Sequence, residues 1–348
     1  MITKDSIKVD FIYVGQGDCI TINWIKNDGS EGLGIVDCAN FNLFKPWMET
    51  HKPNYIDFVL LSHPHSDHFY GIDDLINYCD VNEITIENIY FTFNFHGWYM
   101  NGREFTPEEW IKSVVNEKEK RFKLAKLLEE SVSRHVQRIS ELRWVDDTSK
   151  LRLNSNLMLE FLAPNSFTAK TTYLNQTFDL KSGKKKKRIE NKFKENPSAN
   201  IFSSAIAISA VSEDKKIVLL TSDITTNVKE RIFEKKINHN DNIYLIQVPH
   251  HGSKNGFSEK TLDNFEKSEG CFAVVSVGPN SYNHPNIYVT GCYKSKFRDV
   301  LYTYDGSDEN FNQKLSNLGL LSDIFSNESG VSLKMKSFLI SENECSIF

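Results

Sequence analysis

Hydrophobic residues in the first part of the chain gather in short runs that have the length of β-strands. Residues 7–14 and 19–25 form two such runs, separated by Gly-Gln-Gly-Asp at 15–18, and Gly29 lies in the turn before residues 34–37. Glycine beside polar residues between β-rich runs is typical of hairpin connections. We therefore expect the chain to begin with a β meander.

Later runs continue this pattern and alternate with segments of helical periodicity. Residues 58–61 predict a short buried strand, residues 71–78 a helix and residues 84–95 a further strand. In the second half, strands are expected at 157–162, 201–211, 217–220, 243–248 and 272–277, and helices at 227–235 and 258–266. Each half is then a β meander followed by helices, which predicts an α/β fold of two sheets packed face to face with helices outside.

Two segments depart from this plan and are interpreted as insertions into a single domain that spans residues 1–348. In the first, assigned to residues 100–150, Thr106 and Glu109 form a capping box around Pro107. Apolar residues then recur every three or four positions, as on one face of a long helix: Leu124, Leu128, Val132, Val136, Ile139 and Leu142. The second insertion, residues 170–196, contains Lys-Lys-Lys-Lys-Arg at 184–188 and predicts an exposed basic loop.

Composition and charge narrow the class of protein without indicating its function. The chain has 348 residues, of which 40% are hydrophobic and 25% charged, and its formal net charge is −5. That charge gives no global attraction to nucleic acid, although it is compatible with a local basic patch. The start of the chain lacks an apolar segment of signal-peptide length, and no stretch has the roughly 18 apolar residues of a membrane helix. The six cysteines form no C-x-x-C pair. We expect a cytoplasmic protein with reduced thiols and no membrane association.

A cluster of histidines follows the predicted strand at residues 58–61. The sequence His-Pro-His-Ser-Asp-His at 63–68 contains three of the ten histidines of the chain. His63 and His65, two positions apart, can point the same way and share one metal ion, while Asp67 and His68 can hold a second. Neutral imidazole and carboxylate suit zinc, manganese or iron, so the cluster predicts a metal site.

Further ligand-type residues follow strands in the second half of the chain. Asp223 ends the apolar run at 217–220, and a site for two metal ions needs a bridging carboxylate from elsewhere in the fold. His250 and His251 come directly after the predicted strand at 243–248, which favours one ligand and one outer or catalytic group. His284, in a loop after the strand at 272–277, is a weaker candidate because a histidine in a turn also serves structure.

Taken in order, these motifs resemble the metallo-β-lactamase superfamily. Within it they resemble the branch that holds the hydrolase domain of ComEC-type DNA-uptake proteins and a phosphorylcholine esterase. The resembling motifs are V-G-Q-G-D at 14–18, I-V-D at 35–37, L-S-H-P-H-S-D-H at 61–68, the strand ending in Asp223, H-H-G-S at 250–253 and G-P-N-S-Y-N-H-P at 278–285.

The resemblance implies an αββα sandwich with two divalent metal ions, zinc or manganese, at one edge of the sheets. It implies that His63 and His65 hold the first ion, that Asp67 and His68 hold the second, that Asp223 bridges them and that His251 completes the second site. The catalytic candidates are Asp67 together with His250 and His284, either of which could protonate the leaving group or bind substrate phosphate. Asp18 and Asp37 match motif carboxylates that orient the ligand loops.

The sequence departs from the superfamily pattern at two places. Many members carry a further histidine ligand where this chain has Pro164 and Asn165, and the usual glycine before the bridging aspartate is Ser222. The first departure leaves the number and identity of the metal ions open, and the second predicts a stiffer turn.

The chemistry that such ligands imply is hydrolysis by an activated water. A metal ion lowers the pKa of bound water toward about 7, and a hydroxide held between two ions roughly 3.5–4 Å apart can attack phosphorus. Because the resembling branch is linked to phosphate chemistry and nucleic acid, we expect a metal-dependent phosphodiesterase, most simply a nuclease acting on DNA or RNA.

Two other functions stay open. The chain could hydrolyse a small phosphoester or a cyclic nucleotide with the helical insertion as a lid, or it could be a degenerate module that binds nucleic acid or a partner without turnover. The insertion could also form a homodimer or hold a partner protein. The lysine run is either a solvated loop or a phosphate-attracting arm, and the aromatic residues at 91–99 belong either to the core or to a base-stacking surface.

Overall fold

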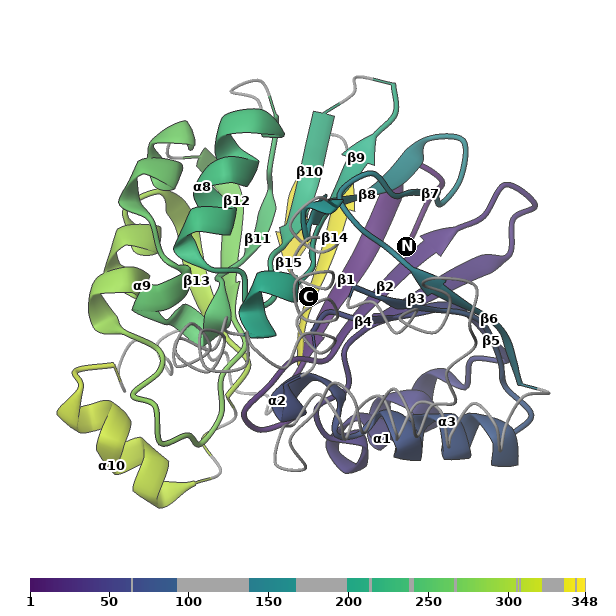
Figure 1. The fold of residues 1–348 in the computed structure, drawn as a ribbon, viewed down its shortest axis with the longest axis horizontal. Helices are drawn as coiled ribbons and strands as arrows, with labels where there is room; N and C mark the ends of the chain where they lie inside the picture. Colours follow the sequence, from purple (N-terminus) through teal and green to yellow (C-terminus); the bar gives the residue numbers. More distant parts are fainter. Residues whose placement is uncertain are drawn as a thin grey trace, which may run out of the picture.

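Two β-sheets form the middle of the molecule, and helices lie on their outer faces (Figure 1). The computed structural model describes residues 1–63, 65–92, 138–166, 199–212, 215–237, 241–265, 268–304, 306, 308–320, 335–341 and 343–347. The predicted α/β class, with two sheets and helices outside them, is confirmed.

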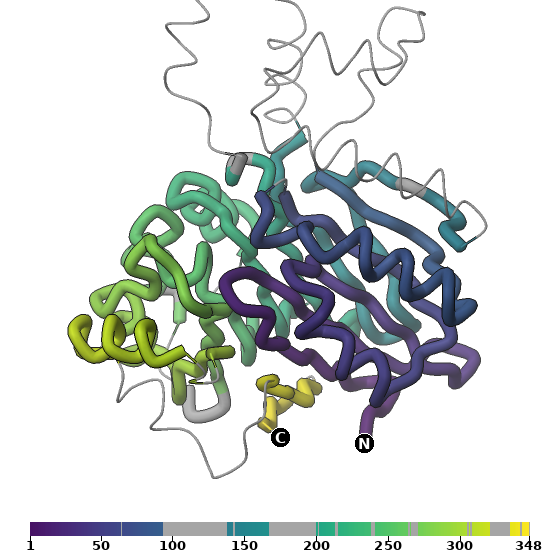
Figure 2. Tube along the Cα trace, turned by 90° about the horizontal axis from the view of Figure 1, so that it is seen from below, coloured from purple at the N-terminus to yellow at the C-terminus, as the bar shows by residue number. Residues whose placement is uncertain are grey.

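The first sheet is built mainly from the N-terminal half of the chain. Its spatial order is β15 (Cys345–Ile347), β14 (Met335–Ser341), β1 (Ser6–Ile12), β2 (Ile20–Ile25), β3 (Glu31–Val36), β4 (Tyr55–Leu61), β5 (Thr85–Phe91) and β6 (Ile139–Trp144). Strands β1 to β3 form the expected meander, and β14 returns to pair antiparallel with β1. Figure 2 accordingly shows both ends of the chain on the same side of the molecule.

The second sheet contains strands from the later part of the chain. Its order is β13 (Phe297–Tyr302), β12 (Ser268–Val275), β11 (Leu245–Gln247), β10 (Lys215–Leu220), β9 (Ala205–Ala210), β8 (Leu157–Ala163) and β7 (Lys150–Arg152). Strands β7 to β10 are antiparallel, whereas β10 to β13 run parallel to one another.

The helices are short and lie at the carboxyl ends or on the outer faces of strands. The α-helices are α1 (Phe41–His51), α2 (Ser66–Phe69), α3 (Ile72–Val81), α8 (Thr226–Lys235), α9 (Ile287–Lys294) and α10 (Glu309–Asn317). The 3₁₀ helices are η3 (Ala199–Phe202), η4 (His250–Gly252), η5 (Lys254–Gly256) and η6 (Glu259–Asn264). Within the described ranges, no helix is both long and apolar enough to cross a membrane.

The alternation of side chains along each strand divides the core into three layers. On β4, Phe58 and Leu60 point into the layer between the sheets, while Val59 packs against the outer helices α1 and α3. On β10, Val218 faces the other sheet and Leu219 faces the layer with α8 and α9. Strands buried on both faces need continuous apolar runs, which is why these segments are hydrophobic throughout.

Aromatic side chains contribute to the contact between the sheets. The rings of Phe272 on β12 and Phe338 on β14 have their centroids 5.6 Å apart, and Tyr90 on β5 meets Phe161 on β8 at 6.0 Å. The indole nitrogen of Trp24 on β2 also donates to the carbonyl oxygen of Leu153 at 3.0 Å. These contacts fix how the two sheets face each other, and therefore which loops meet at their edge.

The long helix predicted from Leu124 to Leu142 is wrong at its C-terminal end, the part that the structure describes. Ile139 and Leu142 lie in strand β6, which pairs parallel with β5 through Ile86 opposite Ile139 and Ile89 opposite Leu142. The apolar spacing matched a helix, but the ladder with β5 and the burial of Ile139 decide the conformation. Residues 93–137, which hold the rest of the predicted helix and most of the 91–99 aromatic segment, lie outside the described residues, as does the whole basic loop at 170–196.

Candidate metal centre

The candidate metal ligands all follow the carboxyl ends of strands. His63, His65, Asp67 and His68 follow β4, Asp223 follows β10, and His250 and His251 follow β11. Strand β4 is parallel to β3, and β10 is parallel to β11, so the loops after them leave each sheet at the same edge. Figure 1 shows helix α2, which carries Asp67 and His68, at the lower ends of the central strands.

The carboxylate of Asp223 lies at the centre of this group. Its Oδ2 atom is 3.8 Å from Nε2 of His63 and 3.5 Å from Nε2 of His250. Its Oδ1 atom is 3.6 Å from Nε2 of both His68 and His251. Each oxygen of this buried carboxylate therefore faces two imidazole rings, one pair on either side, as a bridging group requires.

The remaining candidates join one side or the other of Asp223. Nδ1 of His65 lies 3.0 Å from Nε2 of His63, so these two rings converge as their spacing predicted. On the opposite side, Oδ2 of Asp67 is 3.6 Å from Nε2 of His251. The structure thus brings the other five predicted ligands together around the carboxylate of Asp223.

Hydrogen bonds of Nδ1, the ring nitrogen that points away from Asp223, fix the orientation of His68 and His251. Nδ1 of His68 is 2.7 Å from Oδ2 of Asp37, and Nδ1 of His251 is 2.9 Å from the carbonyl oxygen of Ser276. A carbonyl or ionised carboxylate only accepts, so Nδ1 carries the hydrogen in both rings. Nε2 of each ring then points toward Asp223, and its lone pair is available to a metal ion that displaces the proton on it. Second partners of metal-ligating histidines enforce this orientation.

The donor set fits a divalent metal ion. Among the described residues, Nε2 of His68, Nε2 of His251 and Oδ1 of Asp223 are buried and make no hydrogen bond. Leaving three converging polar atoms unpaired costs on the order of 1–3 kcal/mol each unless a ligand binds them. Ligand atoms of His63, His68 and Asp223, and those of Asp67, His68 and His251, lie within 4.8 Å of one another. Imidazole nitrogen and carboxylate oxygen are the donors that zinc takes in proteins.

Burial and charge compete in setting the pKa values of these groups. Burial lowers the pKa of His251, but Asp223 and Asp67 outweigh it and raise that pKa to about 9. His68 behaves in the same way, because burial is outweighed by Asp223 and Asp37 and its pKa is raised. Burial raises the pKa of Asp223, yet His251 and His68 reverse the sign and lower it. Asp223 is therefore ionised at neutral pH and available as a ligand.

Backbone strain is concentrated in the loops that carry the site. Asp37, Ser222, His250 and His251 adopt left-handed φ angles of 59°, 43°, 51° and 51°. Such conformations cost non-glycine residues roughly 1–3 kcal/mol and gather at functional sites. At Ser222, where glycine was expected from the resemblance, the serine adopts the conformation that glycine favours, and its Oγ donates to Oγ of Ser62 at 2.8 Å.

Gln247, which sequence reasoning missed, connects the two halves of the site. Its Oε1 accepts from the backbone nitrogens of Thr221 and Ser222 at 3.0 and 2.9 Å, and its Nε2 donates to Oδ2 of Asp18 at 2.8 Å. The same oxygen of Asp18 lies 3.6 Å from Nδ1 of His68. A buried amide at the end of the apolar strand β11 was the available signal. Gln247 holds the Asp223 loop against the loop that carries Asp18.

Two asparagines bear on the missing histidine ligand. Asn165, at the position where many superfamily members have histidine, donates from Nδ2 to Oδ2 of Asp147 at 2.9 Å. Asn200 on η3 is buried and places Nδ2 3.4 Å from Nδ1 of His250. Sequence reasoning missed Asn200, because the segment before it gives no motif. The amide therefore contacts the ring nitrogen of His250 opposite the one that faces Asp223.

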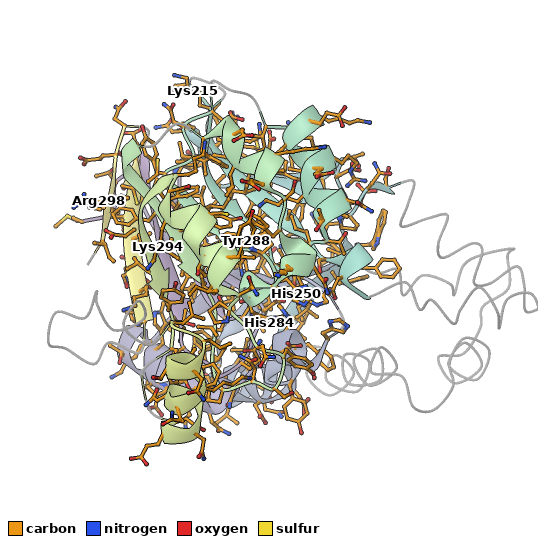
Figure 3. All side chains as sticks on the ribbon, turned by 90° about the vertical axis from the view of Figure 1, so that its left-hand side faces the viewer. Lys215, His250, His284, Tyr288, Lys294 and Arg298 are labelled. Carbon is orange, nitrogen blue, oxygen red and sulfur yellow. The ribbon has the colours of Figure 1, made fainter. Side chains whose placement is uncertain are left out.

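His250 and His284 form the outer side of the site. The side chain of His250 is 19% exposed, and its ring centroid is 5.6 Å from that of His284. Figure 3 shows the two rings on the same part of the surface, close to Tyr288. Burial, aided by the charge of His250, lowers the pKa of His284 to about 4, so His284 is neutral at neutral pH. The weaker sequence candidate thus lies beside the site.

A family model and several solved structures are similar to this chain. The family model of the metallo-beta-lactamase superfamily matches residues 51–138. The chain is similar to the metallo-beta-lactamase fold protein YhfI from Bacillus subtilis, with 12% identity and a TM-score of 0.45 over 86% of this chain and 96% of that chain. No curated protein matches the chain by sequence.

Two further solved structures are similar at the same low identity. A diphosphatase of the PhnP family has 8% identity and a TM-score of 0.39, with 85% of each chain covered. A long form RNase Z from yeast has 11% identity and a TM-score of 0.41, with 91% of this chain and 43% of that chain covered. The family model covers the segment that contains the histidine cluster.

Proposed function

We propose that this protein is a metal-dependent hydrolase of phosphodiester bonds, a nuclease in its simplest form, that uses two divalent ions, zinc or manganese. The observation that carries the proposal is the position of Asp223, whose two carboxylate oxygens face separate pairs of histidines. A binding-only module has no need of two such sets of converging ligands.

In this proposal the ligands divide between two ions. His63 and His65 would hold the first ion on the Oδ2 side of Asp223. Asp67, His68 and His251 would hold the second on the Oδ1 side. Ions bound there supply Lewis acidity toward a phosphoryl oxygen and a nucleophilic water near neutral pH.

The other residues of the site orient the ligands or interact with the substrate. Asp37 and the carbonyl of Ser276 keep the lone pairs of His68 and His251 directed inward. His250, which is partly exposed and lies 3.5 Å from Asp223, is placed to give a proton to a leaving oxygen. Neutral His284 beside it can donate a hydrogen bond to a substrate phosphate. The ComEC-type branch, with its link to DNA, is the assignment we propose within the superfamily on the six sequence motifs.

The test is cleavage of linear DNA, circular DNA and RNA by protein stripped of metal and then given zinc, manganese or magnesium. We expect cleavage to return with zinc or manganese and to be lost in Asp223→Asn. Asp263→Asn is the matched control, because Asp263 is 76% exposed and forms an ion pair with Lys296 at the surface. Cleavage retained in Asp223→Asn would contradict the proposed site, and metal binding without cleavage of any phosphodiester would contradict the proposed activity.

A further inference from the structure

We propose that the loop at residues 280–284 is a preformed platform for a planar aromatic ring of the substrate, such as a nucleobase, and that Tyr282 makes the contact. This inference rests on the proposed function and names the part of the substrate that lies next to the phosphate. It concerns a residue that takes no part in the metal centre.

The first observation is the exposure of Tyr282. Its relative exposure is 65%, although an aromatic side chain of this size usually gains free energy by burial. The ring stacks on His284, with centroids 6.0 Å apart and planes 24° from parallel. One part of the tyrosine is thus held by a histidine of the site while most of its surface is open to solvent.

The second observation is a continuous series of rings from the surface to the metal centre. His284, under Tyr282, lies edge-on to His250 with centroids 5.6 Å apart. His250 in turn places Nε2 3.5 Å from Oδ2 of Asp223. Tyr282 therefore lies on the solvent side of His250 and His284, the two histidines that the proposed function places beside the substrate phosphate. A group attached to that phosphate would project toward Tyr282.

The third observation is that the loop is held rigid by one side chain. Nδ2 of Asn280 donates to the carbonyl oxygens of Gly278 and His284 at 2.9 and 3.0 Å. Oδ1 of Asn280 accepts from the backbone nitrogens of Tyr282 and His284 at 3.0 and 3.2 Å. Binding that orders no loop loses less conformational entropy, so a ring fixed in this way is suited to receive a ligand.

Neighbouring side chains give the platform an apolar and cationic setting. Ile287, which follows the loop, is 50% exposed. Nζ of Lys314 donates to the carbonyl oxygen of Asn280 at 2.5 Å and adds positive charge beside His284. Exposed aromatic surface next to positive charge is the combination with which proteins hold single-stranded nucleic acid, by stacking bases and attracting phosphates.

The experiment compares two ligands that differ only by a nucleobase. Adenosine 5′-monophosphate and ribose 5-phosphate are titrated by calorimetry into zinc-loaded protein. Stacking on an aromatic side chain contributes enough that we expect the nucleotide to bind about tenfold more tightly or better. In Tyr282→Ala and in Tyr282→Leu the ratio of the two affinities falls to near one, whereas Tyr282→Phe keeps it. Tyr288→Ala is the matched control, an exposed tyrosine of the same segment whose ring contacts Phe257 instead of His284, and it keeps the wild-type ratio.

A wild-type ratio of one, or a ratio that survives both Tyr282→Ala and Tyr282→Leu, would overturn the platform. Hydrolysis of bis(p-nitrophenyl) phosphate, measured with the same preparations, separates this result from failure of the proposed function. Hydrolysis with a ratio of one leaves the phosphodiesterase standing and removes the platform. A base preference that depends on Tyr282 without hydrolysis supports the platform and overturns the catalysis. If the protein neither hydrolyses this ester nor binds either ligand, both the platform and the proposed catalysis are overturned.

Discussion

Nδ1 of His68 lies 2.7 Å from Oδ2 of Asp37, although the two residues are 31 positions apart and follow different strands. Asp37 is held in turn by Ser62, whose backbone nitrogen and Oγ both donate to its carboxylate, at 2.8 and 2.6 Å. The consequence is that the only free nitrogen of His68 is the one that faces Asp223. We therefore expect metal binding to depend on this pair as well as on the ligands.

Replacement of Asp37 by asparagine tests that dependence. If the amide oxygen keeps the bond from the Ser62 nitrogen, the amide nitrogen meets Nδ1 of His68 and favours the tautomer with its hydrogen on Nε2. We expect zinc affinity to fall about 10–100-fold, as for other partners of ligating histidines. Titration of the metal-free protein with zinc measures this affinity. Asp57→Asn, which changes a carboxylate of the same sheet paired with Lys26, serves as control. Unchanged affinity in Asp37→Asn would show that Asp37 does not orient His68.

Metal binding should stabilise the folded protein. The unpaired atoms of His68, His251 and Asp223 gain partners only when a cation binds, so binding favours the folded state over the unfolded one. We expect removal of metal by a chelator to lower the Tm and zinc to restore it, with a gain of about 2.7 kcal/mol at one hundred times the Kd. The same additions should leave the Tm of Asp223→Asn nearly constant. An equal zinc response in that variant would place the ion elsewhere.

Gln247 should be needed both for stability and for metal binding. Gln247→Leu leaves the backbone nitrogens of Thr221 and Ser222 and a carboxylate oxygen of Asp18 without their partner. Each buried group left unpaired costs about 1–3 kcal/mol, so urea denaturation of metal-free protein should show a loss in or above that range. Zinc affinity should fall as well, because the Asp223 loop loses its connection to Asp18. Gln313→Leu, on the exposed face of α10, should change neither quantity. A Gln247→Leu variant as stable as wild type would refute the bridging role.

Lys229 should make stability depend on pH. The residue is fully buried, donates to Oη of Tyr293 at 2.8 Å, and burial lowers its pKa to about 7. In the unfolded chain the pKa is near 10.4, so between pH 7 and 10 the unfolded state binds more protons than the folded state. The contribution of Lys229 to the free energy of unfolding is therefore fully present above the pKa of the unfolded chain. Between pH 10 and 7 it falls by about 1.4 kcal/mol for each unit by which the pH decreases.

The measurement is urea denaturation at several pH values from 7 to 10. In Lys229→Met the free energy of unfolding should lose this rise with pH, so the difference between wild type and variant should itself change with pH. Lys235→Met, on the exposed side of the same helix, should keep the wild-type dependence on pH. Parallel pH profiles for wild type and Lys229→Met would show that Lys229 does not titrate in this range.

The sequence by itself determined the features that depend on neighbours in the chain. Residues 58–61 and 217–220 read as buried strands because their side chains alternate between two apolar layers, and the structure places β4 and β10 there. The spacing of His63, Asp67 and His68 placed them on one loop after a strand. Such patterns involve residues a few positions apart, whose relation hardly changes with the rest of the fold.

Tertiary structure alone decided what distant segments do to each other. Gln247 bonds to Asp18 across 229 positions and Ser222 to Ser62 across 160, and no local pattern marks either contact. Ile139 had helical spacing but joined β5 as a strand, because backbone pairing with a neighbour outweighs a weak local preference. Which oxygen of Asp223 faces which histidines also follows from how the two sheets pack. The candidate ligands were visible in the sequence, and the packing of the sheets arranged them on two sides of the Asp223 carboxylate.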